Sequence, residues 1–191
     1  YDGDHINDIL VTNGGDHKAA PFDPRPPGYL MLISGASGNL IAKAVSPDSA
    51  EIYCSPVILD KNGGMLPEII FGTGGEGVAG NLWIANLSDL IQEDLSSAIP
   101  LVSNSELGHI APPSIGELNG DDVLDIITQG FDGKLTAING LDLSVLWQYE
   151  IENTESSASP ILGKFSSTDN NIDVFATIFS GSMSTYDDYY Q

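Results

Sequence analysis

The chain has 191 residues, of which 41% are hydrophobic, so it holds enough apolar material for a sizeable core. Acidic residues outnumber basic ones by 27 to 6, which gives a formal net charge of −21. This balance argues against binding to nucleic acid or to anionic lipid, because both need clustered Lys and Arg. No run approaches the roughly 18 apolar residues of a membrane-spanning helix. Most of the carboxylates are expected to belong to a solvated surface.

Cysteine and histidine offer little chemistry. Cys54 is the only cysteine, which excludes a disulfide within the chain and every Cys-x-x-Cys site. The residues around it, 52–57, predict a strand in which the thiol is buried and inert. The histidines have neither metal-ligand nor catalytic-triad spacing, so we expect ordinary surface or turn roles for them. They are His5, His17 and His109.

The chain contains an internal repeat, in which an Asp-, Asn- and Gly-rich loop precedes a short apolar run. An acid at the end of each loop anchors the alignment, and successive anchors are 48 to 60 residues apart. Such a length suits a four-stranded unit with its loops. The four anchors are Asp8, Glu68, Asp125 and Asp173.

In chain order, each unit predicts strands alone. The apolar run is followed by a glycine turn and an alternating strand, as in Gly80–Ala85 and Gly133–Asn139. A third strand follows, as in Ser144–Tyr149, and a Ser-Pro strand opens the next unit, where proline is tolerated. One short helix is expected between Ser88 and Ser97, capped by Ser88.

These units predict an all-β chain built from four-stranded antiparallel blades. A flat sheet with two apolar faces needs cover on both, and radial stacking in a β-propeller provides it. A closed propeller needs about four to eight blades. The chain holds about 3.5 of them, so we expect the remainder of the same polypeptide to complete the ring. The approximate units are 1–54, 55–112, 113–158 and 159–191.

The acidic loop of the third unit is the clearest candidate for a cation site. Its side-chain oxygens stand at alternating positions, and Ca²⁺ prefers six to eight oxygen ligands. Gly120 allows a sharp turn. The predicted ligands at positions 1, 3, 5 and 9 are Glu117, Asn119, Asp121 and Asp125, with the carbonyl of Val123 at position 7.

The other units match this pattern to different degrees. The first supplies Asp2, Asp4 and Asp8 with the carbonyl of Ile6, and the second supplies Asp60, Asn62 and Glu68. The second has Gly64 at position 5, and the fourth retains only Asp169 and Asp173, with Ser167 nearby, after a one-residue length change. The alternative is that such clusters only form turns. Recurrence disfavours it for units one and three and leaves it open for two and four.

The loops resemble the FG-GAP (integrin α-type) repeat, whose loop reads Asp-x-Asp/Asn-x-Asp-Gly-x-x-Asp before a hydrophobic strand. The resemblance extends over essentially the whole chain, and the stretches Gly133–Asn139 and Leu146–Trp147 also resemble quinoprotein-type blades. It implies calcium at the hairpin loops and ligands held elsewhere on the propeller face. In this chain His5 and Asp122 replace the glycine after position 5, which predicts strain in the turn, and Glu117 replaces the usual Asp. An EF-hand is excluded because no helices flank the loops.

Several further features have structural alternatives. Asp16–Gly28 is a proline-rich insertion, expected to be an exposed variable loop or a binding loop. Gly72–Gly77 lacks the Lys-Ser/Thr of a phosphate loop and predicts a flexible turn between strands. Trp83 and Trp147 are expected to pack between blades instead of forming sugar platforms. Asn86-Leu87-Ser88 is a glycosylation sequon.

Together these features predict a non-catalytic, calcium-stabilised module that binds a protein or glycan partner. Its expected location is extracellular or at the cell surface, with the periplasm as a further option. One alternative is an enzyme on the same scaffold, a polysaccharide lyase or a quinone-dependent dehydrogenase. The dehydrogenase is disfavoured because Arg25 and five lysines are the only cations available for the cofactor's carboxylates. The other alternative is a structural part of a surface assembly.

Overall fold

The structure is a computed structural model that describes residues 3–16, 18–19, 23–60, 66–166 and 171–180. The described chain is all-β, apart from one helix of five residues, as the sequence predicted. The strands are β1 (Ile9–Thr12), β2 (Tyr29–Ile33), β3 (Leu40–Val45), β4 (Val57–Leu59), β5 (Glu68–Gly72), β6 (Gly80–Asn86), β7 (Ile99–Asn104), β8 (Ser114–Gly116), β9 (Asp125–Gln129), β10 (Leu135–Ile138), β11 (Val145–Tyr149), β12 (Thr154–Glu155), β13 (Ile161–Gly163), β14 (Asp173–Phe175) and β15 (Phe179–Ser180).

The strands form three principal antiparallel sheets in chain order. The first sheet has the order β1-β2-β3, the second β4-β5-β6-β7, and the third β11-β10-β9-β8. The two four-stranded sheets confirm the predicted antiparallel four-stranded unit. Two small pairs, β13-β14 and β12-β15, follow them. The first sheet has three strands in the described part of the chain.

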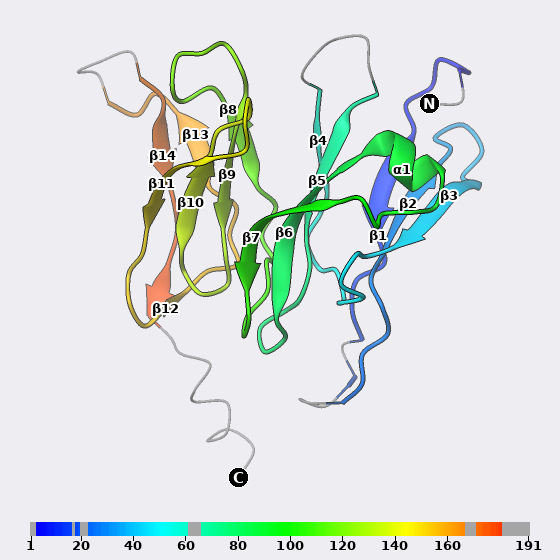
Figure 1. Cartoon of the computed structure of the whole chain (residues 1–191), viewed down its shortest axis with the longest axis horizontal. Helices are drawn as coiled ribbons and strands as arrows, with labels where there is room; N and C mark the ends of the chain where they lie inside the picture. The colour runs from blue at the N-terminus through cyan, green and yellow to red at the C-terminus, as the bar shows by residue number, and fades with distance from the viewer. Residues whose placement is uncertain (1–2, 17, 20–22, 61–65, 167–170, 181–191) are drawn as a thin grey trace.

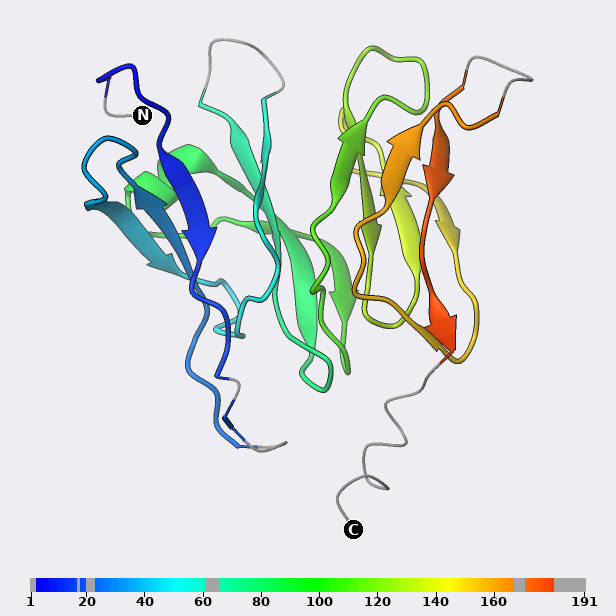
Figure 2. The ribbon, with the colours of Figure 1, turned by 180° about the vertical axis from the view of Figure 1, so that it is seen from behind.

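Consecutive sheets pack face to face, and each interface has its own apolar core (Figures 1 and 2). Between the first and second sheets, Leu30 and Ala42 meet Ile69 and Phe71. Between the second and third sheets lies a separate cluster, and a further one joins the third sheet to β13 and β14. Because both faces of β9 are covered, all five of its residues are buried. A run buried on both faces needs no alternation of apolar and polar residues.

Trp83 contacts the cluster between the first and second sheets, which confirms its predicted packing role. Its indole Nε1 donates to Asp48 Oδ2 at 3.3 Å and to Thr73 Oγ1 at 3.2 Å. Trp147, by contrast, remains 38% exposed on β11. Cys54 is fully buried, as predicted, and burial raises the pKa of its thiol to about 12, so the thiol stays protonated and unreactive.

The connections between sheets run along one end of the stack and hydrogen-bond to the turns on either side. Ile52 forms bridges with Gly14 of the first unit and Gly74 of the second. In the next connection, the N–H of Gly108 donates to the Gly75 carbonyl at 2.8 Å, and its own carbonyl accepts from Phe131 N–H at 3.0 Å. Each connection therefore ties two neighbouring sheets together through the backbone.

The turn at Gly72–Gly77 connects β5 to β6, which confirms that a strand, not a helix, follows it. Residues 72–75 of the turn are buried and residues 76–77 are exposed, so its flexibility stays a prediction. A Cβ on Gly108 would overlap the backbone of this turn at Gly74 and Gly75, so the two segments lie in backbone-to-backbone contact. Glycine is required here for close approach.

The N-cap of helix α1 (Leu87–Ile91) lies two residues earlier than predicted, and the helix ends at Ile91 instead of extending toward Ser97. The residue at its N-cap is Asn86, not Ser88, and it makes no side-chain capping bond. Its amide instead donates to Asp89 Oδ2 at 3.3 Å. Burial of Leu87 and Leu90 against the first sheet determines where the helix begins, so packing outweighs the capping preference of serine.

Part of the proline-rich insertion is fixed to the body of the protein. Arg25 Nη1 lies 3.4 Å from Glu51 Oε2, and Glu51 is buried. The Tyr53 hydroxyl also donates to Glu51 Oε2 at 3.1 Å. Burial, and after it the charge of Glu51, raises the pKa of Tyr53. The insertion is therefore anchored at Arg25, while Asp23, Pro24 and Pro26 are exposed as expected.

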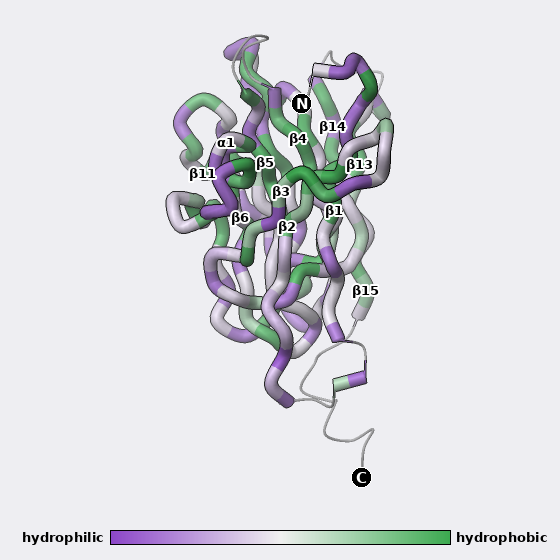
Figure 3. Tube along the Cα trace, turned by 90° about the vertical axis from the view of Figure 1, so that its right-hand side faces the viewer, coloured by the Kyte–Doolittle hydropathy of each residue, from purple (hydrophilic) through white to green (hydrophobic). Residues whose placement is uncertain are grey.

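Hydropathy follows this layout. Hydrophobic residues follow the strands in the interior, and hydrophilic residues gather in loops at the ends of the sheets (Figure 3). In the described part of the chain, no helix has the length and apolar character that crossing a bilayer requires.

Candidate functional site

The acidic loops lie at one end of the stacked sheets. β1 begins at this end. In the hairpins β4-β5, β8-β9 and β13-β14, the first strand runs toward this end and the second strand starts from it (Figures 1 and 2). The two strands of each hairpin are antiparallel, and the three hairpins have the same orientation in their units. The repeat in sequence thus places the first residues of β1, β5, β9 and β14 at one end of the stacked sheets.

Strand register places the anchor acid identically in three units. The acid is the first paired residue of the second strand, and the loop that it closes has eight residues in the second and third units and nine in the fourth. The extra residue confirms the predicted length change. The register also puts Lys164 at position 1 of the fourth loop, where the other units have an acid, and the sequence analysis missed this. The pairs are Leu59 with Glu68, Gly116 with Asp125, and Gly163 with Asp173.

In the third unit the anchor carboxylate joins the loop to the next hairpin. Asp125 is fully buried, and its Oδ2 accepts a hydrogen bond from Leu118 N–H at 2.8 Å. Its Oδ1 accepts one from Gly140 N–H, in the β10-β11 turn, at 3.0 Å. A Cβ on Gly140 would overlap the Leu124 carbonyl oxygen, so only glycine brings this N–H to the carboxylate. Hydrogen bonds to a carboxylate are among the stronger ones in proteins.

The first unit repeats this contact. Asp8 Oδ1 accepts a hydrogen bond from Gly35 N–H at 3.2 Å, and a Cβ on Gly35 would overlap the Asn7 carbonyl oxygen. The two anchor acids are 117 positions apart in the chain, yet each binds a turn glycine in the same way. The glycine therefore belongs to the repeat, although the sequence alone did not reveal it.

The loop backbones match as well. Gly3 and Gly120 both have φ of +84°, and His5 and Asp122 have φ of +66° and +63°. The predicted strain is confirmed, because His5 and Asp122 adopt a left-handed conformation that glycine accepts at lower cost. Residues at position 5 brace this turn in both loops: Asp4 Oδ1 accepts from Ile6 N–H at 2.7 Å, and Asp121 Oδ1 accepts from Val123 N–H at 2.8 Å.

The other predicted ligands of the third loop also accept backbone hydrogen bonds. Glu117 Oε1 accepts from Asn119 N–H at 2.8 Å, and Asn119 Oδ1 accepts from Asp121 N–H at 3.0 Å. Among the described residues, no three His, Cys, Asp or Glu side chains come close enough together to hold a metal ion. The donor set of carboxylate, amide and carbonyl oxygens fits the chemistry of Ca²⁺.

The remaining predicted ligands differ in their exposure to solvent. Asp60 is exposed, Ile6 is 52% exposed, and Val123 is half-buried. Asp2, Asn62 and Asp169 lie outside the described residues.

The second and fourth loops share this geometry to different degrees. In the second, Leu87 occupies the place of the turn glycine, and its N–H donates to the Pro67 carbonyl at 3.0 Å instead of to the anchor acid. In the fourth, Asp173 Oδ2 accepts from Phe165 N–H at 2.8 Å and from Ser166 N–H at 2.7 Å. The anchor contact to the loop thus persists in the fourth unit.

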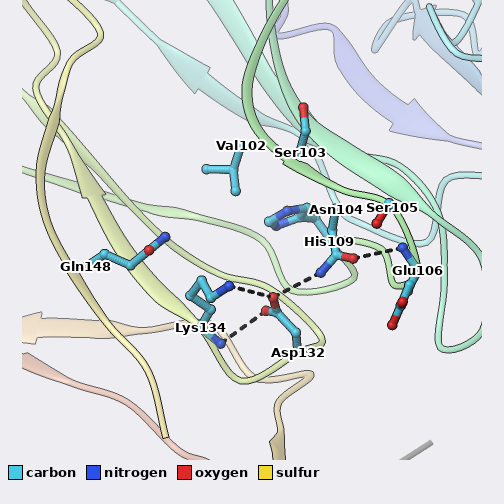
Figure 4. A pocket seen from close by; sticks show the side chains of 9 residues that line it. All are labelled: Val102, Ser103, Asn104, Ser105, Glu106, His109, Asp132, Lys134 and Gln148. Atoms are coloured by element: carbon cyan, nitrogen blue, oxygen red, sulfur yellow. Dashed lines mark hydrogen bonds and ion pairs between the residues drawn. The ribbon is translucent and has the colours of Figure 1, made fainter. Parts of the chain in front are cut away.

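A second candidate site lies on the side of the connections, between the second and third sheets (Figure 4). It is a pocket with a volume of about 330 Å³ and a largely polar lining. The sequence analysis missed it because its side chains come from three separate parts of the chain: the end of β7 with the following loop, the β9-β10 turn, and β11. The lining residues are Val102, Ser103, Asn104, Ser105, Glu106, His109, Asp132, Lys134 and Gln148.

His109 lines this pocket, so the predicted surface or turn role is wrong for it. The residue is 3% exposed because its backbone lies against Gly72, where a Cβ would overlap the His109 carbonyl. Its ring Nδ1 is buried and has no hydrogen-bonding partner in the described structure. Burial lowers the pKa of His109 to about 4, against the opposing charge of Asp132, so the ring is neutral at pH 7. His5 is exposed, as predicted, and His17 lies outside the described residues.

Asp132 organises the other polar groups of the pocket. Its Oδ2 accepts from the Asn104 amide at 2.9 Å and lies 3.6 Å from Lys134 Nζ. Its Oδ1 accepts from Lys134 N–H at 3.1 Å. Lys134 Nζ also lies 3.6 Å from Glu150 Oε2. Groups from the second and third sheets therefore hold the Asp132 carboxylate in place beside the β9-β10 turn (Figure 4).

Comparison with protein-family models, curated protein sequences and solved structures gave no significant match. The fold by itself defines the class: an all-β protein whose antiparallel sheets pack face to face in chain order, with acidic loops at one end and a polar pocket toward the other.

The turn glycine of the repeat gives a direct test of the loop architecture. We expect Gly140→Ala to lower the free energy of unfolding by about 2 kcal/mol or more, because a methyl group would displace the Leu124 carbonyl and with it the hydrogen bond to Asp125. Urea unfolding in the presence of a calcium chelator measures this change in the free energy of unfolding without a contribution from bound calcium. The matched control is Gly75→Ala, whose methyl would meet only side-chain atoms, at 3.3 Å. Equal losses in both variants would contradict the assignment.

The buried histidine predicts a dependence of stability on pH. The pKa of His109 is about 4 in the folded protein and about 6.5 in an unfolded chain, so the unfolded state binds the proton first as the pH falls. The stabilisation is complete above about pH 6.5 and is lost, by about 3 kcal/mol in all, as the pH falls to about 4. Urea unfolding of the wild type and of His109→Gln across this range should give curves that diverge in slope. Parallel curves would show that the ring is not buried in its neutral form.

Proposed function

We propose that the chain is part of a calcium-stabilised β-propeller that binds a protein or glycan partner outside the cell and has no catalytic activity. The observation that carries this proposal is the shared geometry of the first and third acidic loops. Two loops far apart in sequence have the same backbone conformation and the same anchor contact. Turn formation alone does not require carboxylates at the same positions of two separate loops, so this repetition supports a shared role as cation ligands.

The propeller part of the proposal draws on the stacking of the sheets. The second and third sheets each bury one face against the preceding sheet and the other against the strands that follow, as blades do. The backbone connections at one end link each sheet to the next in the same manner. A closed ring has about four to eight blades. The described sheets would supply three of them and part of a fourth.

In the proposed cation sites, the third loop would contribute Glu117, Asn119, Asp121 and Asp125 with the carbonyl of Val123. The first would contribute Asp2, Asp4 and Asp8 with the carbonyl of Ile6. The second, with Asp60, Asn62 and Glu68, would be weaker because Leu87 replaces the turn glycine and Gly64 offers no side-chain oxygen. Sites with few charges suit the millimolar calcium found outside cells. Calcium there would stiffen the loops and would take no part in chemistry.

Calcium should raise the melting temperature of the protein. A cation that binds only the folded state stabilises it by mass action, by about 2.7 kcal/mol at a hundredfold excess over its dissociation constant. We expect a higher melting midpoint in millimolar CaCl₂ than in EGTA, and a smaller rise for Asp121→Asn. Asparagine keeps an oxygen for the Val123 N–H but removes the charge. The control Asp94→Asn, at an exposed site outside the loops, should respond as the wild type does. An unchanged wild-type midpoint would refute the calcium sites.

Binding and catalysis can be separated by experiment. The expected result is saturable binding to a glycan array or to extracellular proteins without turnover of polysaccharides by the same preparation. Arg25 is already paired with the buried Glu51, which leaves the described part of the chain without an arginine to hold a quinone cofactor's carboxylates. Cleavage of a polysaccharide by the purified protein, lost on mutation of a pocket residue such as Asp132, would favour the enzyme alternative instead.

A further inference from the structure

We infer that the pocket between the second and third sheets binds a neutral sugar ring, a single monosaccharide unit of a glycan. This inference deepens the proposed function and rests on it for the choice of a glycan as partner. It uses residues at the opposite end of the sheets from the acidic loops, so it does not depend on calcium. The pocket is defined by Asn104, Glu106, His109, Asp132 and Lys134, together with Gln148.

The first observation is the set of buried polar atoms without partners beside the pocket. His109 lines the pocket, and its Nδ1 is one of them. Thr128 Oγ1 is another, on a strand behind the lining. Thr128 pairs with Thr136 across β9 and β10, and the Thr136 hydroxyl accepts a hydrogen bond from Gln148 at 2.9 Å. Directly paired residues lie on the same face of a sheet, so Thr128 lies on the face that carries Gln148. Buried polar groups in native proteins almost always have partners, and an ordered water or a bound molecule can supply the one that is missing here.

The second observation is the mixture of donors and acceptors in the lining. Carboxylates at Asp132 and Glu106 accept hydrogen bonds, whereas amides at Asn104 and Gln148 and the ammonium of Lys134 donate them. A sugar hydroxyl both donates and accepts, so neighbouring hydroxyls of one ring can meet a carboxylate and an amide together. The neutral imidazole of His109 offers one donor and one acceptor of its own.

The charges of the pocket disfavour other ligands. Two carboxylates face one ammonium, and the imidazole carries no charge at neutral pH, so an anion such as phosphate has too little positive charge to meet. A cationic ligand would compete with Lys134, which already lies 3.6 Å from Asp132. Val102 is the only aliphatic side chain in the lining, which leaves little surface for an apolar molecule. A neutral, hydroxyl-rich ligand satisfies all three conditions.

The size of the pocket agrees with this class. Its volume of about 330 Å³ is at the lower end of the range of about 300–1,000 Å³ for small-molecule sites. Such a space admits one ring and not an extended oligosaccharide. Ser103, Ser105 and Glu106 are exposed at its rim, so the rest of a glycan chain can leave toward solvent.

The test is saturation-transfer difference NMR on the full chain with free monosaccharides. The probes are glucose, galactose, mannose and N-acetylglucosamine, with glucuronate and glucosamine as charged counterparts. We expect at least one neutral sugar to bind with millimolar affinity. Asp132→Asn and Gln148→Ala should each weaken its binding about three- to tenfold, which corresponds to the loss of one hydrogen bond. Gln92→Ala, at an exposed glutamine next to α1, is the matched control and should bind as the wild type does. Thermal melting verifies that each variant is folded.

Three results would overturn the inference: no neutral sugar binds to the folded wild type, only the charged sugars bind, or binding persists unchanged in both pocket variants. The proposed function is tested separately by the glycan array. If wild type and pocket variants bind the same immobilised glycan equally well, the module binds through another surface and only the pocket assignment fails. If no partner binds the array and no sugar binds in solution, both fail.

Discussion

The second and third sheets of this protein each have two apolar faces, and neither face is stable in water alone. This constraint accounts for the order of the whole chain. The third sheet buries Ile126 and Ile138 against the second sheet and Ile127 and Ala137 against β13 and β14, so successive residues of β9 contribute to different cores. A sheet covered on one side only would leave half of these residues in contact with water, at a cost of about 1.5–3 kcal/mol for each large side chain. Face-to-face stacking in chain order removes that cost with short connections.

Stacking then determines what each end of the sheets can do. At one end lie the acidic loops of the first and third units, whose anchor acids are reached by turn glycines of the same sheet. At the other end the connections lie in backbone contact with the turns. The first end is suited to local, repeated sites formed by one loop each. The second end is suited to sites formed between sheets, because residues from different units meet there.

The pocket shows how such a site arises from packing. Gly108 and His109 are drawn into the interior because the connection has to pass between two turns, and the ring follows the backbone. Asp132 and Lys134 stand in the β9-β10 turn, and Asn104 ends β7, so the three meet only when the second and third sheets stack. The acidic loops, in contrast, are completed almost entirely by residues within ten positions of one another.

The local features could be predicted from the amino-acid sequence: the strands, the antiparallel units, the spacing of the anchor acids, the longer fourth loop and the strained turns at His5 and Asp122. These follow from side-chain alternation, β-propensity and backbone sterics, which act over a few residues. The packing of the sheets was needed to reveal the glycine contacts of Gly35 and Gly140, the burial of His109 and of the Gly72 turn, the start of α1, and the pocket. Each depends on which residues of one sheet or hairpin face those of another. No local pattern encodes such a contact, because it is formed by segments that meet only after the sheets have stacked.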